Sequence, residues 1–118
     1  MLQKLDTQHL NRLALADALA NMKESNFDMR NPRHCICGHA LRLLHKCWLP
    51  FGWESQLRAG AEVLGISIEQ ARELFVPINR AKTNDPYTHP QDAARVVRYL
   101  AATDTVDWSV AGELKQPT

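Results

Sequence analysis

The sequence predicts an all-α protein that folds as a single compact domain of about five helices. Apolar residues recur at three- and four-residue steps in five separate stretches, two of which are close enough together to form an αα-hairpin. With 118 residues, the chain has the length of one ordinary domain, residues 1–118. Its 45% hydrophobic and 23% charged residues are typical of globular proteins. We expect residues 1–5 and 112–118 to fray.

The first predicted helix runs from about Thr7 to Lys23, with Asp6 or Thr7 as its N-cap. Six apolar positions fall on one side of this helix and are predicted to face the core. They are Leu10, Leu13, Ala14, Ala18, Leu19 and Met22.

The second predicted helix, from about Cys35 to Trp48, is expected to be central and nearly the most buried. It follows a loop over residues 24–33 that Phe27 and Met29 should anchor. Its apolar stripe consists of Cys37, Ala40, Leu41, Leu44 and Trp48. Pro50 cannot continue the helix, and the aromatic residues around it should fold back onto the core.

A helical hairpin is predicted over residues 55–75. The first helix, from about Ser55, ends at Gly65, which suits the left-handed C-terminal position. Ser67 and Gln70 have the spacing of a capping box and start the next helix, which ends before Pro77. The apolar face of this second helix consists of Ala71, Leu74 and Phe75.

The last predicted helix begins near Thr88, which forms a second capping-box match with Gln91, and carries Pro90 in its first turn. The apolar face consists of Ala94, Val97, Leu100 and Ala101, and the polar face of Asp92, Arg95 and Arg98. After Thr103, residues 106–110 alternate between apolar and polar, which favours an extended C-terminal tail laid over the helices.

Four segments resemble a loose group of small uncharacterised proteins from bacteria and phages. They are Cys35–Ala40 (C-x-x-G-[HW]-A), residues 61–75 (A-x-x-L-G-[LI]-x(4)-A-x-x-L-F), Thr88–Val97 (T-x-x-x-A-A-x-x-[VL]) and Val106–Trp108 (V-D-W). The resemblance covers about residues 25 to 110. It implies an all-helical architecture and brings no established activity, catalytic residue or cofactor. Residues 31–34 lack the Cys-Gly pair that many such sequences carry.

A local basic region stands out in a chain whose formal net charge is only +1. No acidic residue lies between Asp28 and Glu54. The candidate anion or nucleic-acid contacts are Arg30, Arg33, Arg42 and Lys46 from this interval, together with Arg72 from the hairpin. Free N–H groups at a helix start favour anions. The alternative is that acids from other segments, such as Glu24, Glu54 or Glu73, neutralise the region after folding.

Potential metal ligands crowd residues 34–47: His34, Cys35, Cys37, His39, His45 and Cys47. On a helix Cys35 and His39 share a face while Cys37 points elsewhere, so one tetrahedral zinc site does not follow from the spacing. A Cys35–His39 nucleophilic pair is a further alternative. We interpret the cluster instead as buried thiols that behave as small hydrophobic side chains. No metal, cofactor or catalytic residue is therefore predicted.

The hairpin also matches the spacing of a helix-turn-helix, with small residues at Ala61, Gly65 and Ala71. However, residues 67–75 offer one cation against two anions, Glu69 and Glu73, and such a surface repels phosphates. The five aromatic residues Trp48, Phe51, Trp53, Phe75 and Trp108 are expected to lie mainly in the core. If several stay exposed, they favour a self-association surface.

The predicted function is that of a non-enzymatic helical module acting through protein–protein contacts, either with an unknown partner or as a homodimer. The alternative is a helix-turn-helix-like DNA-binding or phage-related regulator that uses residues 67–75. No secretory signal and no membrane-length apolar run occurs, so no membrane partner is expected. The odd number of cysteines, three, is typical of reduced thiols and a cytoplasmic protein.

Overall fold

The computed structural model describes residues 3–28, 34–45, 52–75 and 89–110, and it confirms the all-α fold class. Its elements are α1 (Gln3–Ala20), the 3₁₀ turn η1 (Glu24–Asn26), α2 (Ile36–Ala40), the π-helical turn η2 (Leu41–His45), α3 (Trp53–Leu64), α4 (Ile68–Phe75) and α5 (Pro90–Thr103). None of the helices in these ranges has both the length and the apolar character needed to span a bilayer.

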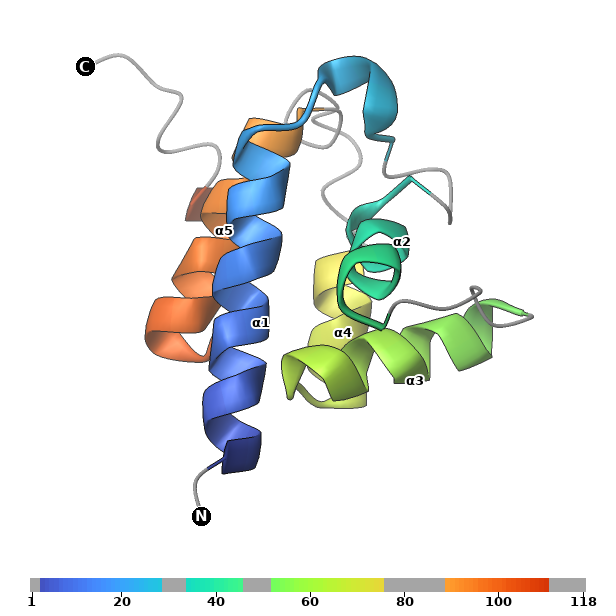
Figure 1. Cartoon of the computed structure of the whole chain (residues 1–118), viewed down its shortest axis with the longest axis vertical. Coiled ribbons are helices and arrows are strands. Elements are labelled where there is room, and N and C mark those ends of the chain that lie inside the picture. Colours follow the sequence, from blue (N-terminus) through green and yellow to red (C-terminus); the bar gives the residue numbers. More distant parts are fainter. Residues whose placement is uncertain (1–2, 29–33, 46–51, 76–88, 111–118) are drawn as a thin grey trace.

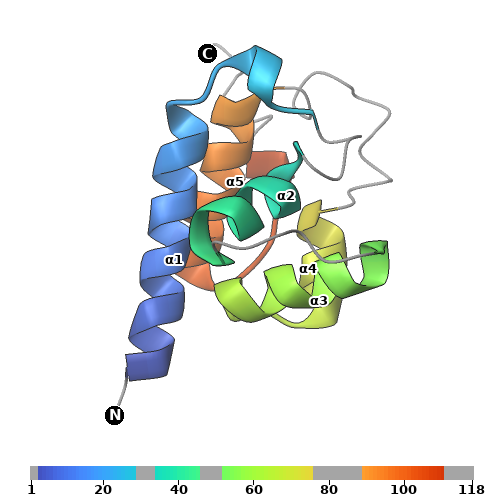
Figure 2. The same cartoon turned by 45° about the vertical axis from the view of Figure 1, so that its right-hand side comes forward.

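The helices form two groups that meet at α1 (Figures 1 and 2). Helices α1 and α5 run antiparallel, side by side, and make the most extensive contact between elements. The α3–α4 hairpin forms the second group, and α2 packs against both of its helices. Fully buried leucines from both groups meet in one core. They are Leu15, Leu19, Leu57, Leu64, Leu74 and Leu100.

The hairpin forms as the sequence predicts. Gly65 adopts the left-handed conformation (φ 69°, ψ 42°). Its N–H donates to the carbonyl of Glu62 at 3.2 Å, and the N–H of Ile66 donates to that of Ala61 at 3.0 Å, which together make a Schellman motif. Ser67 and Gln70 then form the predicted capping box, with reciprocal side-chain-to-backbone bonds of 3.0 and 3.1 Å.

The first helix extends further toward the N-terminus than predicted. It begins at Gln3 and ends at Ala20, so Asp6 and Thr7 lie within it and neither is its N-cap. After it, Phe27 is buried and anchors the following segment as expected, whereas Met29 lies outside the described residues.

The second predicted helix, Cys35–Trp48, is helical from Ile36 to His45, the last described residue before Trp48. Regular α-helix covers Ile36–Ala40, and a wider π-helical turn continues to His45. Of the predicted stripe, Cys37, Ala40 and Leu41 are buried and Leu44 is partly buried. Residues 46–51, with Trp48, Pro50 and Phe51, lie outside the described part of the chain.

Helix α5 begins one residue later than the predicted capping box requires. His89 is the N-cap and Pro90 the first helical residue, which confirms the place of the proline but not the cap. Gln91 uses its side-chain amide elsewhere, donating to the carbonyls of Ala20 (3.3 Å) and Met22 (3.1 Å). Ala20 is the last residue of α1 and Met22 follows it, so Gln91 links α5 to the end of α1 instead of capping its own helix.

Asp92 departs from the predicted polar face of α5, because only 2% of it is exposed. Its carboxylate accepts a hydrogen bond from Arg95 Nη1 at 2.8 Å. Beyond α5, Trp108 is buried and its indole N–H donates to the carbonyl of Glu73 at 2.9 Å, so the segment does lie over the hairpin. It is not fully extended: Ser109 and Val110 turn helical.

Candidate functional site

The side of α1 that faces the hairpin carries three polar side chains in hydrogen-bond contact with the end of α3. The last carbonyls of an α-helix have no partner within the helix and need donors from elsewhere. Gln8 Nε2 donates to Glu62 O at 3.1 Å, and Asn11 Nδ2 donates to Val63 O at 2.8 Å. These two bonds extend the Schellman turn, so the end of α3 is capped mainly from α1.

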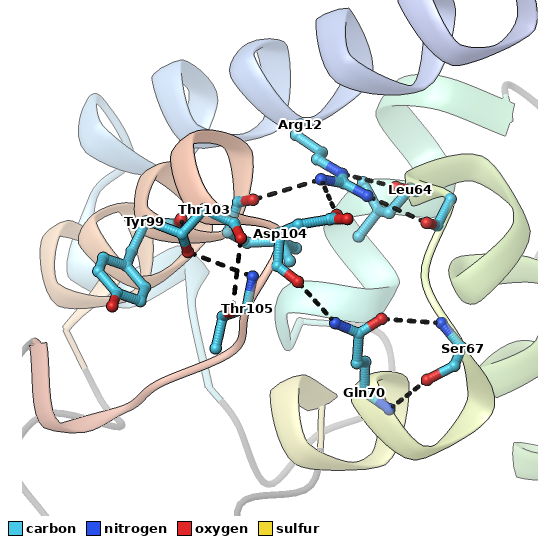
Figure 3. Close-up of polar contacts among 10 residues, drawn as sticks. Arg12, Leu64, Ser67, Gln70, Tyr99, Thr103, Asp104 and Thr105 are labelled. Atoms are coloured by element: carbon cyan, nitrogen blue, oxygen red, sulfur yellow. Dashed lines mark hydrogen bonds and ion pairs between the residues drawn. The ribbon is translucent and has the colours of Figure 1, made fainter.

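Arg12 completes this junction and joins it to α5 (Figure 3). Its Nε donates to Leu64 O at 2.7 Å and its Nη2 to Gly65 O at 3.0 Å. Its Nη1 donates to Leu100 O at 3.3 Å and to the Asp104 carboxylate at 2.8 Å. The guanidinium therefore meets the carbonyl ends of two helices, where the helix dipoles favour a positive charge.

Asp104 and Gln70 link the end of α5 to α4 at the same junction (Figure 3). Asp104 ends α5 in the left-handed conformation, with φ 65°. Gln70 Nε2 donates to the Asp104 carbonyl at 2.9 Å while its Oε1 accepts the N–H of Ser67. One glutamine thus caps α4 and links it to the end of α5.

The predicted core face of α1 is wrong for its first half. Leu10 is 62% exposed and Leu13 39% exposed, and Ala14 is exposed as well. The buried residues are Leu15, Ala16 and Leu19, and Arg12 is only 8% exposed. The physical reason is that the inward side combines an apolar stripe through Leu15 and Leu19 with Arg12, which supplies donors for the carbonyls of α3.

The result is an apolar patch on the solvent side of α1, formed by Leu10, Leu13 and Ala14, which we call the outer face. The three residues are spaced i, i+3 and i+4, so their side chains lie together on adjacent turns. Two other large apolar side chains are exposed in the described residues, Leu43 of η2 and Trp53 of α3. Single exposed leucines are common on protein surfaces, whereas Leu10 and Leu13 are exposed together on one helix face.

The structure places only part of the predicted anion-binding set. Arg42 is exposed on η2, and Arg72 lies on α4. Arg72 Nη2 is 3.6 Å from a carboxylate oxygen of Glu54, which also faces Arg58 at 3.8 Å. Acid–base pairing after folding, the alternative considered for the basic region, therefore holds at Arg72. Arg30, Arg33 and Lys46 lie outside the described residues.

The two described cysteines do not form a nucleophilic site. Cys35 and Cys37 are both buried and form no disulfide, and burial raises the pKa of each thiol. Cys37 Sγ donates to the Gln56 carbonyl at 3.3 Å. His39 bonds through Nε2 to the Asn26 carbonyl at 2.8 Å. These observations support the interpretation of the thiols as core residues, because a protonated buried thiol is a poor nucleophile.

Sequence reasoning missed the role of Arg12. Apolar residues occur on both sides of α1, so periodicity alone does not select the buried side. The usable signal is the spacing of Gln8, Asn11 and Arg12 at i, i+3 and i+4, which places three long donors on one side. The spacing can be interpreted only when it is known that another helix ends opposite these three side chains.

Comparisons of this chain with protein-family models, with curated proteins and with solved structures found no match. The resemblance to a group of small bacterial and phage proteins therefore stays a prediction.

Proposed function

We propose that this protein is a non-enzymatic helical module that acts through protein–protein contacts, with the outer face of α1 as its contact surface. The observation that carries the proposal is the exposure of Leu10 and Leu13, 62% and 39%, on the side of α1 away from the core. Burying a leucine side chain completely is worth about 1.5–3 kcal/mol. Two leucines one turn apart thus provide the centre of a small interface.

A second copy of the chain is the partner to test first, because the same helix face on two molecules pairs under twofold symmetry. Mass measurement by light scattering over a concentration series gives the oligomeric state. We expect the wild-type protein to form dimers and the double variant Leu10→Glu/Leu13→Glu to be monomeric. Leu43→Glu is the matched control, because Leu43 is as exposed as Leu13 but lies on η2.

A different protein partner gives a different pattern in the same experiment. The wild type then remains monomeric, and capture from the native cell extract, with and without nuclease, retrieves a protein that Leu10→Glu/Leu13→Glu does not retain. The proposal is contradicted if the double variant assembles and captures proteins as the wild type does, or if Leu43→Glu alone abolishes both.

DNA binding by residues 67–75 is the second candidate, and the geometry of the α3–α4 hairpin favours it. Ala61 and Ala71 are buried where the helices meet, and Gly65 makes the turn, as a helix-turn-helix requires. The surface of α4 gives less support, since Glu69 and Glu73 are exposed and Arg72 faces Glu54. An electrophoretic shift at low salt that Arg72→Ala weakens would support this candidate over the first.

A cytosolic location for this module rests on the sequence features alone.

A further inference from the structure

The imidazole of His39 joins two segments that are separate in the chain. His39 lies on α2, and its Nε2 is 2.8 Å from the carbonyl oxygen of Asn26, the last residue of η1. The ring also stacks on Phe27, with centroids 6.1 Å apart and planes inclined by 14°. The backbone of His34, just before α2, is a further hydrogen-bond partner of the same ring. One side chain therefore contacts the backbone on both sides of the connection between η1 and α2.

Residues 24–28, which we call the latch, are held against the start of α2 by backbone and side-chain contacts. The N–H of Asp28 donates to the carbonyl of His34 at 3.0 Å. Phe27 is only 5% exposed and belongs to the core. A carbonyl only accepts, so His39 holds the latch through a protonated Nε2, which the neutral ring can supply. Release of the latch would move Phe27 and the imidazole of His39 into water.

The surroundings of His39 disfavour a positive charge on its ring. Burial lowers the pKa of His39, and Arg42 and His34 add to this effect, although the backbone hydrogen bonds of the ring act in the opposite direction. The ring centroids of His34 and His39 are 6.0 Å apart. The carboxylate of Asp28 acts on Cys35, next to His34, where burial raises the pKa of the thiol. A proton on His39 would thus be placed among basic groups and away from water.

A second histidine contacts the other end of the latch. His89, the N-cap of α5, has its Nδ1 2.6 Å from a carboxylate oxygen of Glu24. A proton on His89 would place opposite charges at this distance, and they would attract each other. Acid therefore acts on the two ends of the latch in opposite directions. Loosening in acid is expected at the end that His39 holds.

We propose that the latch is an acid-sensitive switch, in which neutral His39 holds residues 24–28 against α2 and protonation of His39 favours their release together with Phe27. Well above about pH 6.5 the ring is neutral in both states, so the latch stays closed. As the pH falls below about 6.5, the released state, with His39 in water, takes up a proton more readily, and the closed state loses stability. The switch is independent of the outer face of α1, so it stands or falls separately from the proposed interaction surface.

Hydrogen exchange of the full chain at pH 7 and pH 5, with each rate divided by the intrinsic rate of an unstructured amide, tests the switch. The probes are the hydrogen-bonded amides of Asn26, Phe27 and Asp28. We expect their protection in the wild type to fall at least about threefold from pH 7 to pH 5. His9→Gln, which removes an exposed histidine of α1, is the matched control and should show the same fall. His39→Gln keeps an N–H donor but takes up no proton, so its fall should be less than about 1.5-fold. Protection in the wild type that does not change with pH, or an equal fall in His39→Gln, overturns the proposal.

A second measurement on the wild type decides the matter if His39→Gln folds poorly. Long-range ¹H–¹⁵N correlation spectra follow the ring nitrogens of each histidine through a pH titration. The pKa of His39 should lie below the ordinary value for histidine. The ring protons of Phe27 should shift with the same midpoint, because the two rings stack in the closed latch. A pKa of His39 at or above the ordinary value, or Phe27 signals that do not follow its titration, contradicts the switch.

Discussion

The two sides of α1 use their residues in opposite ways. The inner side buries an arginine, 8% exposed, beside Leu15 and Leu19, which are fully buried. The outer side leaves Leu10 and Leu13 in solvent. The side that faces the core is the one that supplies both buried leucines and donors for backbone carbonyls, whereas the outer side offers two leucines alone.

The inner side of α1 faces the core because the ends of two other helices lie opposite it. Helices α3 and α5 both end against it, and Arg12 meets the carbonyls of Leu64, Gly65 and Leu100. With a leucine at this position, the carbonyls of Leu64 and Gly65 would lose these donors, at about 1–3 kcal/mol for a carbonyl that is buried. The Leu100 carbonyl would still accept the N–H of Asp104 at 2.7 Å. Burying Leu10 or Leu13 completely would stabilise the fold by about as much as supplying a donor to one buried carbonyl. Arg12 therefore favours the observed orientation.

The largest difference in stability is expected between a leucine on the inner side of α1 and a leucine on its outer side. Leu15→Ala should lower the free energy of unfolding by about 2–5 kcal/mol, because it opens a cavity in the core. Leu13→Ala should change it by no more than about 1 kcal/mol, because Leu13 is 39% exposed and packs less tightly. Urea unfolding followed by circular dichroism measures both. Equal losses in the two variants would mean that the assigned orientation of α1 is wrong.

The next largest difference in stability is expected between replacing a buried arginine and replacing an exposed one. Arg12→Leu should cost about 2–4 kcal/mol, since it leaves the carbonyls of Leu64 and Gly65 without their donors. Arg98→Leu removes an exposed ion pair with Asp17 at 3.2 Å and should cost less than about 1 kcal/mol. The same urea experiment applies. A loss at Arg98 as large as that at Arg12 would show that the carbonyl contacts contribute little.

Local signals in the sequence were enough to predict the hairpin. The left-handed Gly65 and the reciprocal bonds of Ser67 and Gln70 depend on residues no more than a few positions apart, so the sequence contains all of the information. The same holds for the buried face of α4.

The predictions that were wrong depend on contacts between distant segments. Gln91 has the spacing of a capping residue, yet it bonds to the carbonyls of Ala20 and Met22, about seventy positions away in the chain. Asp92 was expected in solvent, yet only 2% of it is exposed. The orientation of α1 is the same kind of case. For the candidate sites, the sequence indicated the histidine cluster but not which two rings meet, since that depends on how the segment near Asn26 folds back.

The smallest effect concerns the two amides that flank the arginine on the inner side. Asn11 and Gln8 cap neighbouring carbonyls of α3, but the Asn11 bond is partly buried and the Gln8 bond is exposed. Asn11→Ala should cost about 1 kcal/mol and Gln8→Ala less than about 0.5 kcal/mol, because water replaces an exposed donor more easily. Hydrogen exchange at the end of α3, together with urea unfolding, resolves effects of this size.

Placing a negative charge at position 11 distinguishes the loss of the Asn11 hydrogen bond from active repulsion of the α3 carbonyls. Asn11→Asp keeps the size of the side chain but turns its donor into a carboxylate that faces the Val63 carbonyl and the negative end of the α3 dipole. It should therefore be more destabilising than Asn11→Ala, although alanine removes more atoms. If instead the aspartate variant is as stable as the wild type, the end of α3 does not depend on donors from α1, and another cause must be found for the inward turn of its polar side.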